Sequence, residues 1–151
     1  MVARTVVESL AGAALSVSAA IPGPFDGATY AALAWTAVGQ IENYGNHGVT
    51  AAVTEFTPVD TAVVAKVKGS KNYGNMALTL GNMPGDSGQA LLKTASESNN
   101  HYSVKVVYPD TAVHYLDVLV TKFEFQDGSV NDVQKVSCEF ALCRAPVIVN
   151  P

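Results

Sequence analysis

The stretch Val113–Leu142, VHYLDVLVTKFEFQDGSVNDVQKVSCEFAL, determines most of the fold. Apolar and polar residues alternate in both of its halves, and a period of two is typical of a strand with one buried face. The Gly-containing turn Gln126–Ser129 separates the halves, so the sequence predicts a hairpin of two strands, Val113–Phe125 and Val130–Leu142. The residues of the second strand that are expected to face the core are Val136, Cys138, Phe140 and Leu142.

The same alternation continues upstream of this hairpin. Further strands are predicted at Leu15–Ile21, Thr36–Tyr44, Asp60–Gly69, Asn75–Gly81 and His101–Tyr108. The turn Asn72–Gly74 lies between two of them, so we expect Asp60–Gly69 and Asn75–Gly81 to pair with each other. The core-facing residues of the strand Asn75–Gly81 are expected to be Met76, Leu78 and Leu80.

Two segments have the pattern of a helix. In Asp86–Ser98, Asp86 can cap the first turn, and Gln89 follows at the spacing of a capping box. The apolar stripe of this helix consists of Leu91, Leu92 and Ala95. The shorter, Ala-rich segment Asp26–Trp35 predicts one or two helical turns that begin at Asp26.

Roughly seven strands and one main helix predict a single mainly β domain over residues 1–151. The expected architecture is an antiparallel β-barrel or sandwich with one packed helix. An N-terminal arm covers residues 1–14, an extended loop or protruding hairpin covers 45–58, and a C-terminal tail, 144–151, is expected to extend away. The tetrapeptide Asn-Tyr-Gly-Asn occurs at 43–46 and at 72–75, and we interpret the two copies as independent turns because their flanks differ.

The composition is low in charge. Only 15% of the residues are charged, against about 25% in a typical soluble domain. Either much of the surface meets another protein, or the exterior is unusually poor in charge. The net charge of −4 argues against a nucleic-acid-binding surface, and no apolar stretch has the length of about 20 residues that a membrane-spanning helix needs. We expect an uncleaved N-terminus and synthesis in the cytoplasm.

The sequence contains no convincing catalytic or metal-binding pattern. The tetrapeptide Gly85–Gly88, GDSG, together with His47 and Asp60, repeats the His, Asp, Ser order of chymotrypsin-like proteases around Ser87. Asp86 is explained better as a helix cap, and the spacing from His47 to Ser87 is too short to build one barrel between them.

The other reactive side chains are isolated. The histidines His47, His101 and His114 share no metal-ligand spacing, although His101 and His114 begin neighbouring predicted strands. Cys138 and Cys143 are expected on opposite faces of a strand as buried, reduced thiols. We therefore assign no catalytic residue, no cofactor and no metal.

The order of several short segments resembles the major tail tube proteins of long-tailed, siphovirus-type bacteriophages. The segments that carry the resemblance are Ser16–Ala20 (SVSAA), Thr29–Trp35 (TYAALAW), Val38–Ile41 (VGQI), Lys66–Gly74 (KVKGSKNYG), Pro84–Lys93 (PGDSGQALLK) and Tyr102–Tyr108. A long hairpin follows them, so the resemblance covers nearly the whole chain. Each segment is weak evidence, and the series carries the argument.

The resemblance implies a structural virion protein, made in the host cytoplasm, without enzymatic activity or cofactor. Such proteins form hexameric rings whose inner sheets join into a continuous barrel, and the rings stack into a tail tube. The implied partners are other copies of the chain, the length-determining tape measure protein and tail-end proteins. DNA is implied only as a passenger during ejection, and no membrane is involved.

The resemblance also implies where contacts form. The loop 45–58 and its flank are expected to reach a neighbouring ring, and the residues expected in this contact are Tyr44, Asn46, His47, Glu55, Phe56 and Pro58. The residues expected to face the lumen, because they are acidic and lie in predicted strands, are Glu42, Asp117 and Glu124. For each of these three, an ordinary solvated outer face is an equally good interpretation.

Two other functions are compatible with parts of the sequence. A secreted β-sandwich binding module, for example for carbohydrate, would require a cleaved N-terminus and exposed aromatic residues on one sheet face. A small hydrolase would be built around Ser87. A structural assembly protein accounts best for the low charge, because a subunit enclosed by neighbours needs few solvated side chains.

Overall fold

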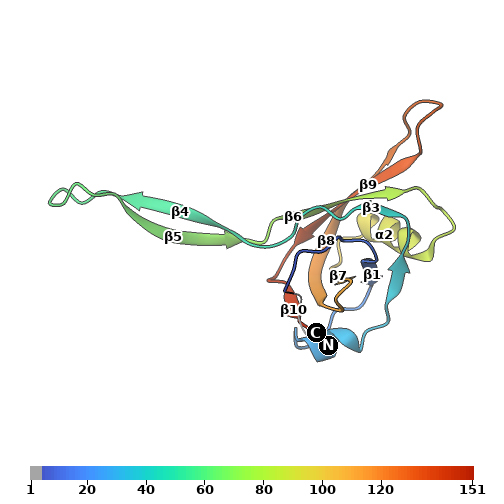
Figure 1. Cartoon of the computed structure of the whole chain (residues 1–151), viewed down its shortest axis with the longest axis horizontal. Helices are drawn as coiled ribbons and strands as arrows, with labels where there is room; N and C mark the ends of the chain where they lie inside the picture. Colours follow the sequence, from blue (N-terminus) through green and yellow to red (C-terminus); the bar gives the residue numbers. More distant parts are fainter. Residues whose placement is uncertain (1–4) are drawn as a thin grey trace.

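The long predicted hairpin forms the centre of the molecule in the computed structural model, which describes residues 5–151 (Figure 1). Strand β8, Val113–Gln126, pairs through its second half with β9, Lys135–Leu142. The second strand starts five residues later than predicted, because the segment before it forms a turn. In this turn the Ser129 amide donates to Asp132 Oδ2 at 2.8 Å.

The remaining strands extend this pair on both sides into one antiparallel sheet. They are β1 (Ala14–Ser18), β2 (Thr36–Val38), β3 (Ile41–Asn43), β6 (Asn75–Gly81), β7 (Tyr102–Val107) and β10 (Val147–Val149). The strand order is β2-β1-β7-β8-β9-β6-β3, with β10 paired to β8. The predominance of strands over helices confirms the predicted mainly β class.

The two edge strands of this sheet are neighbours in the sequence. Only Gly39 and Gln40 separate β2 from β3, and Gln40 has a positive φ of 61°. Because the chain passes directly from one edge to the other, the sheet has to curl around on itself like a barrel. The predicted strand Thr36–Tyr44 is therefore two strands with a corner between them.

The core lies inside this curled sheet. Its largest fully buried side chains are Phe140, Leu15, Met76, Leu78, Leu80, Leu92, Leu116, Val17, Val104, Val106 and Val118. The inward-facing residues predicted for β6 and β9 are all buried, so the period-two analysis is confirmed there. Cys138 is buried, and burial raises the pKa of its thiol to about 12. Cys143, also predicted to be buried, is exposed.

Helix α2, Ser87–Glu97, is fastened to the corner between β2 and β3. Asp86 caps it, accepting from the Gln89 amide at 3.0 Å and from the Gly39 amide at 3.3 Å. The Gln89 side chain donates to the Gly39 and Gly81 carbonyls and accepts from the Met83 amide. The cap is confirmed, whereas Gln89 bonds the sheet instead of completing a capping box.

The short predicted helix is also present. Helix α1, Gly27–Ala31, begins at its cap Asp26, whose carboxylate accepts from the Thr29 amide. Tyr30 stacks on Tyr115 of β8 with ring centroids 5.1 Å apart. The Trp35 indole donates to the Tyr30 carbonyl at 3.0 Å. This aromatic group joins α1 to the outer face of β8.

A second, two-stranded sheet projects from the body (Figure 1). Strand β4, Thr50–Phe56, pairs with β5, Ala65–Asn72, and we call residues 50–72 the arm. The predicted pairing of β5 with β6 is wrong, because β6 pairs with β3 and β9. Both strands have period two, but β6 buries its apolar face against β9, whereas every residue of β5 is exposed.

The C-terminal tail returns to the sheet. The prediction that it extends away is wrong, since β10 pairs with the first residues of β8. Arg144 reaches back to Asp117 at 3.0 Å and covers the ring of Phe25 at 3.8 Å, which turns the chain towards this edge. Among residues 5–151, no helix is long and apolar enough to span a membrane.

Candidate functional site

The arm is the most exposed element of the molecule and has two unlike faces. Directly opposed residues of an antiparallel pair point to the same face. One face, the apolar face, consists of Thr54, Phe56, Ala65 and Val67. The other, the charged face, consists of Val53, Glu55, Lys66 and Lys68. The Phe56 side chain on the apolar face is 64% exposed, which is unusual for a large aromatic residue in a free subunit.

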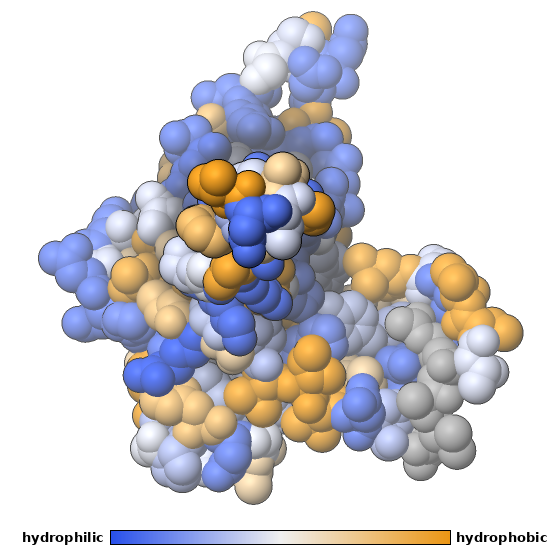
Figure 2. Space-filling model, turned by 90° about the vertical axis from the view of Figure 1, so that its left-hand side faces the viewer, coloured by the Kyte–Doolittle hydropathy of each residue, from blue (hydrophilic) through white to orange (hydrophobic). Residues whose placement is uncertain are grey.

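The end of the arm is apolar as well. Residues 57–64 connect β4 to β5, and a bond from the Ala62 amide to the Pro58 carbonyl closes a turn there. Three valines of this segment, Val59, Val63 and Val64, are exposed. Figure 2 looks towards the body with the arm pointing at the viewer, and hydrophobic residues alternate with hydrophilic ones around its end. Exposed apolar residues gathered in one place are typical of a surface that contacts another molecule.

The arm leaves the body between the two copies of Asn-Tyr-Gly-Asn. In the first copy the Gly45 amide donates to Asn43 Oδ1 at 2.7 Å, and in the second the Gly74 amide donates to Asn72 Oδ1 at 2.8 Å. The φ angles of the two glycines are 66° and 70°. Although their flanks differ, as the sequence shows, the two copies form the same turn on the two sides of one arm. We call residues 43–49 and 72–75 the arm root.

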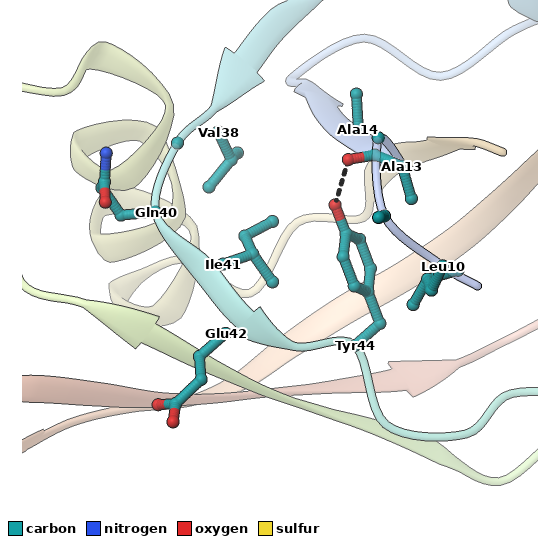
Figure 3. Close-up of a pocket in the computed structure, with 11 residues that line it drawn as sticks. Leu10, Ala13, Ala14, Val38, Gln40, Ile41, Glu42 and Tyr44 are labelled. Atoms are coloured by element: carbon teal, nitrogen blue, oxygen red, sulfur yellow. Dashed lines mark hydrogen bonds between the residues drawn. The ribbon is translucent and has the colours of Figure 1, made fainter. Parts of the chain in front are cut away.

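Both tyrosines of this repeat anchor the arm root. Tyr44 and Tyr73 are partly buried against the core, and the Tyr44 hydroxyl donates to the Ala13 carbonyl at 3.0 Å (Figure 3). Burial raises the pKa of Tyr44. Figure 3 also shows Val38 and Ile41 beside Tyr44, in a groove of about 550 Å³ between the N-terminal segment and the edge strands β2 and β3.

A histidine pair lies beside these turns. His47 Nε2 of the arm root is 2.8 Å from His114 Nδ1 of β8, and the Tyr108 hydroxyl lies 3.4 Å from the same Nδ1. His114 pairs with His47 and not with His101, which sequence analysis had placed near it. His101 instead bonds Asp117 on the opposite face of β8. No group of three or more potential metal ligands occurs among residues 5–151.

The residues expected in contacts with a neighbouring ring fall into two places. Tyr44, Asn46 and His47 belong to the arm root, whereas Glu55 and Phe56 lie on β4. Pro58 begins the turn at the end of the arm. The predicted loop 45–58 is therefore only the first half of the projecting element, and sequence analysis missed Val67, which lies opposite Thr54 on the apolar face.

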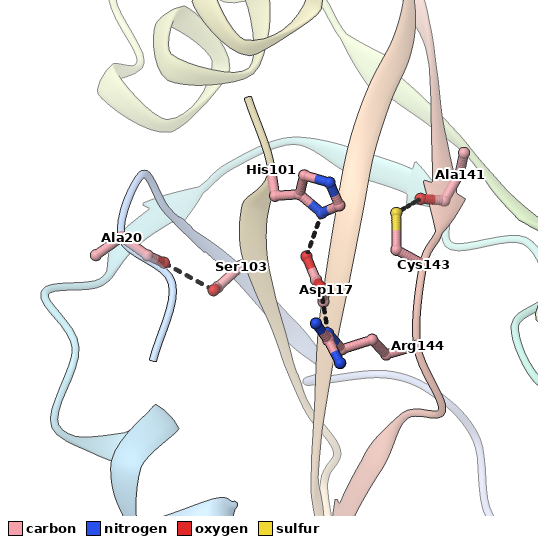
Figure 4. A network of polar contacts seen from close by, with 7 residues as sticks. All are labelled: Ala20, His101, Ser103, Asp117, Ala141, Cys143 and Arg144. Carbon is pink, nitrogen blue, oxygen red and sulfur yellow. Dashed lines mark hydrogen bonds and ion pairs between the residues drawn. The ribbon is translucent and has the colours of Figure 1, made fainter. Parts of the chain in front are cut away.

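The residues expected to face a lumen have two different environments. Glu42 and Glu124 are exposed and pair with Lys135 at 2.8 Å and with Lys122 at 3.7 Å. Asp117 is only 3% exposed, and its carboxylate binds His101 and Arg144 (Figure 4). A buried carboxylate has no surface to present to a channel, so the expectation for Asp117 is wrong. Its actual role is to hold the C-terminal segment and the start of β7 to β8.

The hydrolase constellation is not assembled. Ser87 is the first residue of α2 beside its cap Asp86, while His47 is bonded to His114 at the arm root. Ser87 therefore has no histidine placed to accept its proton among the described residues.

Edges and area also indicate surfaces for assembly. Strands β2 and β3 each have one unpaired edge, and β7 covers β8 only as far as Val118. The accessible surface is 8944 Å², while the scaling for compact monomers gives roughly 7,300 Å² for a 15.8 kDa chain. The excess reflects the arm and the projecting end of the β8–β9 hairpin (Figure 1).

Known proteins share both the sequence pattern and the fold. Residues 22–151 match the family described as phage tail tube protein, TTP. No curated protein sequence is similar enough to this chain to match it. The family assignment therefore rests on the match over residues 22–151, and membership of this family suggests a non-enzymatic, structural role.

Three solved structures illustrate the fold. A chain of the anti-feeding prophage baseplate has a TM-score of 0.73 at 10% identity, covering 97% of this chain and 98% of that chain. A chain of the sheath/tube terminator of the extracellular contractile injection system PVC has a TM-score of 0.70 at 10% identity, covering 95% of this chain and 97% of that chain. The SPP1 tail tube has a TM-score of 0.61 at 15% identity, covering 92% of this chain and 77% of that chain.

Such identities show a common fold alone, whereas the family match spans most of the chain and includes the helix and the arm. The chain therefore belongs to the phage tail tube protein family and is a structural component of the phage virion.

Proposed function

We propose that this chain forms hexameric rings that stack into a tube, and that the arm joins one ring to the next. The observation that supports this most is the arm itself, an exposed hairpin with an apolar face and no cover from its own subunit. Solved structures of similar fold include a tail computed with C6 symmetry and an SPP1 tail tube. A ring of six copies also agrees with the free strand edges described above.

Edge pairing would close each ring. The unpaired edges of β2, β3 and the second half of β8 carry backbone groups that another strand can bond. Joining them between neighbouring copies pairs these edges of the main sheet once the ring closes. Cyclic symmetry thus turns a feature that favours uncontrolled aggregation in a free subunit into a specific contact.

The arm would dock by its apolar face on a copy in the adjacent ring. Phe56 and Val67 would be buried there, while Lys66 and Lys68 on the charged face would remain near solvent or meet acidic residues of a neighbour. Asn46, His47, Glu55 and Pro58 would border this contact.

The tube would conduct DNA and enclose the tape measure protein. A lumen should be free of a strong positive charge, because cationic walls bind phosphates and slow passage. Glu42 and Glu124 remain our candidates for the lumen surface. Tail-end proteins of similar fold would close the tube at its ends.

Electron microscopy of the purified chain tests the arm. Replacing residues 51–71 by Asn-Gly removes it cleanly, because Thr50 and Asn72 are a cross-strand pair. We expect the shortened chain to give rings or subunits and the wild type to give tubes.

A pair of point variants locates the docking face. Phe56→Asp on the apolar face is expected to abolish tubes, and Lys68→Asp on the charged face to leave them. Normal tubes from the shortened chain would refute the role of the arm, and equal effects of the two point variants would refute the choice of face.

A further inference from the structure

Two side-chain hydrogen bonds fasten the first segment of the arm root, residues 43–49, to the body. The Tyr44 hydroxyl bonds the Ala13 carbonyl, and His47 bonds His114. Tyrosine stays protonated throughout the neutral range, whereas an ordinary histidine changes its charge near pH 6.5. The histidine pair is therefore the contact that a modest change of pH can alter.

The geometry of the pair sets a limit on its protonation. His47 Nε2 and His114 Nδ1 are 2.8 Å apart, and their rings are nearly perpendicular at 80°. One nitrogen has to donate a proton and the other has to accept it with a lone pair. When both rings are protonated, two N–H groups face each other and two positive charges lie side by side, so the contact becomes repulsive.

The neighbours of the pair on the flanking strands are uncharged, and one acidic residue, Asp110, opposes this repulsion. On β8, His114 lies opposite Val106 of β7 on one side and Ile148 of β10 on the other, and neither is charged. In the turn between β7 and β8, the Tyr108 ring is 4.6 Å from the His114 ring, and Asp110 is the nearby acidic residue. Lys105 of β7 lies over Trp35 on the other face.

The pKa directions agree with this geometry. Burial lowers the pKa of His47, and burial together with the charge of His47 lowers that of His114, while Asp110 raises it more weakly. With pKa values below the ordinary 6.5, the closed root binds fewer protons than an open one. Its stability is complete above about pH 6.5 and is lost as the pH falls through the lowered values.

We propose that His47 and His114 form an acid-sensitive latch, which holds the arm root against the end of the barrel at neutral pH and releases it when both rings are protonated. The two Asn-Tyr-Gly-Asn turns fix the backbone on the two sides of the arm. The latch determines whether residues 43–49 stay in contact with β8. The consequence for tubes rests on the proposed function of the arm, while the latch itself is a property of the subunit.

Hydrogen–deuterium exchange of the full chain at pH 7.5 and pH 5.0, corrected for intrinsic exchange rates, tests the latch. In the wild type we expect amides of residues 46–50 and 112–116 to exchange faster at pH 5.0. Each tenfold difference in proton affinity between open and closed root contributes about a tenfold change in opening. The double variant His47→Gln, His114→Gln should lose this response, and His101→Gln, which removes a histidine on the other face, should keep it.

Two outcomes would overturn the latch: equal protection at both pH values in the wild type, or an undiminished acid response in the double variant. Histidine titration by NMR in the wild type gives a second measurement that does not depend on how the variants fold, and an ordinary or raised pKa for both rings would also overturn it. Tubes are scored separately by microscopy. Wild-type tubes are expected to dissociate at pH 5.0 and those of the double variant to persist. If exchange behaves as expected but neither the wild type nor any variant forms tubes at pH 7.5, the proposed function fails and the latch stands.

Discussion

Gly45 and Gly74 show how one local sequence is used in two packing environments. Both occupy the same place in an Asn-Tyr-Gly-Asn turn, with φ of 66° and 70°. A Cβ atom on Gly45 would lie 2.2 Å from the Ala77 carbonyl oxygen of β6, whereas nothing lies within 4 Å of a Cβ on Gly74. The two glycines are equivalent in backbone conformation and different in packing.

Alanine at these two positions should therefore have unequal effects. Gly74→Ala introduces only the cost of a left-handed backbone, about 1–2 kcal/mol. Gly45→Ala adds a clash with the backbone of β6, so we expect a total loss above about 3 kcal/mol in the free energy of unfolding. Urea denaturation of the two variants measures the difference, and equal losses would contradict the close packing at Gly45.

At the scale of an element, one side chain of helix α2 hydrogen-bonds three separate backbone groups of the body. Gln89 is only 3% exposed and makes hydrogen bonds to the Gly39 and Gly81 carbonyls and to the Met83 amide. The corner between β2 and β3, the end of β6 and the helix are thus joined at a single amide. Without it, three backbone groups next to the core would lose their partner.

Replacing Gln89 by alanine should destabilise the protein by about 2–4 kcal/mol, because buried backbone groups would be left without hydrogen bonds. Gln126→Ala, at the exposed end of β8, is the matched control and should change the free energy of unfolding by less than about 0.5 kcal/mol. Thermal or urea unfolding compares the two. A loss at Gln89 no larger than that of the control would show that the helix is fastened elsewhere.

At the scale of the whole molecule, exposed apolar surface and low charge have a common explanation. With 15% charged residues, the chain can solvate only part of an accessible surface of 8944 Å². The large exposed hydrophobic residues concentrate in the arm, near the N-terminus and around the end of the β8–β9 hairpin. Contacts between copies would cover these places.

Assembly should accordingly stabilise the fold by mass action. We expect the Tm of the wild type to rise with protein concentration, because association favours the folded state. The chain shortened at 51–71 should show a smaller dependence, since it retains ring contacts and lacks the arm. Differential scanning calorimetry over a hundredfold range of concentration measures both, and a Tm independent of concentration in the wild type would argue against assembly.

The sequence by itself determined the parts that depend on local pattern. Alternation placed Met76, Leu78 and Leu80 in the core, and the caps Asp26 and Asp86 marked the two helices. These features depend on residues within one or two turns of each other. The motif order also pointed to the tail tube family, which the match over residues 22–151 confirms.

Only the tertiary structure decided which strands pair and which charges are buried. The sequence of strand β5 alternates as that of β6 does, yet β5 pairs with β4, because period two specifies a face and not a partner. Asp117 was indistinguishable from a surface carboxylate until Arg144 and His101 were found beside it, 27 and 16 residues away. The contact between His47 and His114 was unpredictable for the same reason. Contacts between residues far apart in the sequence depend on how the sheet curls, and local spacing carries no information about that.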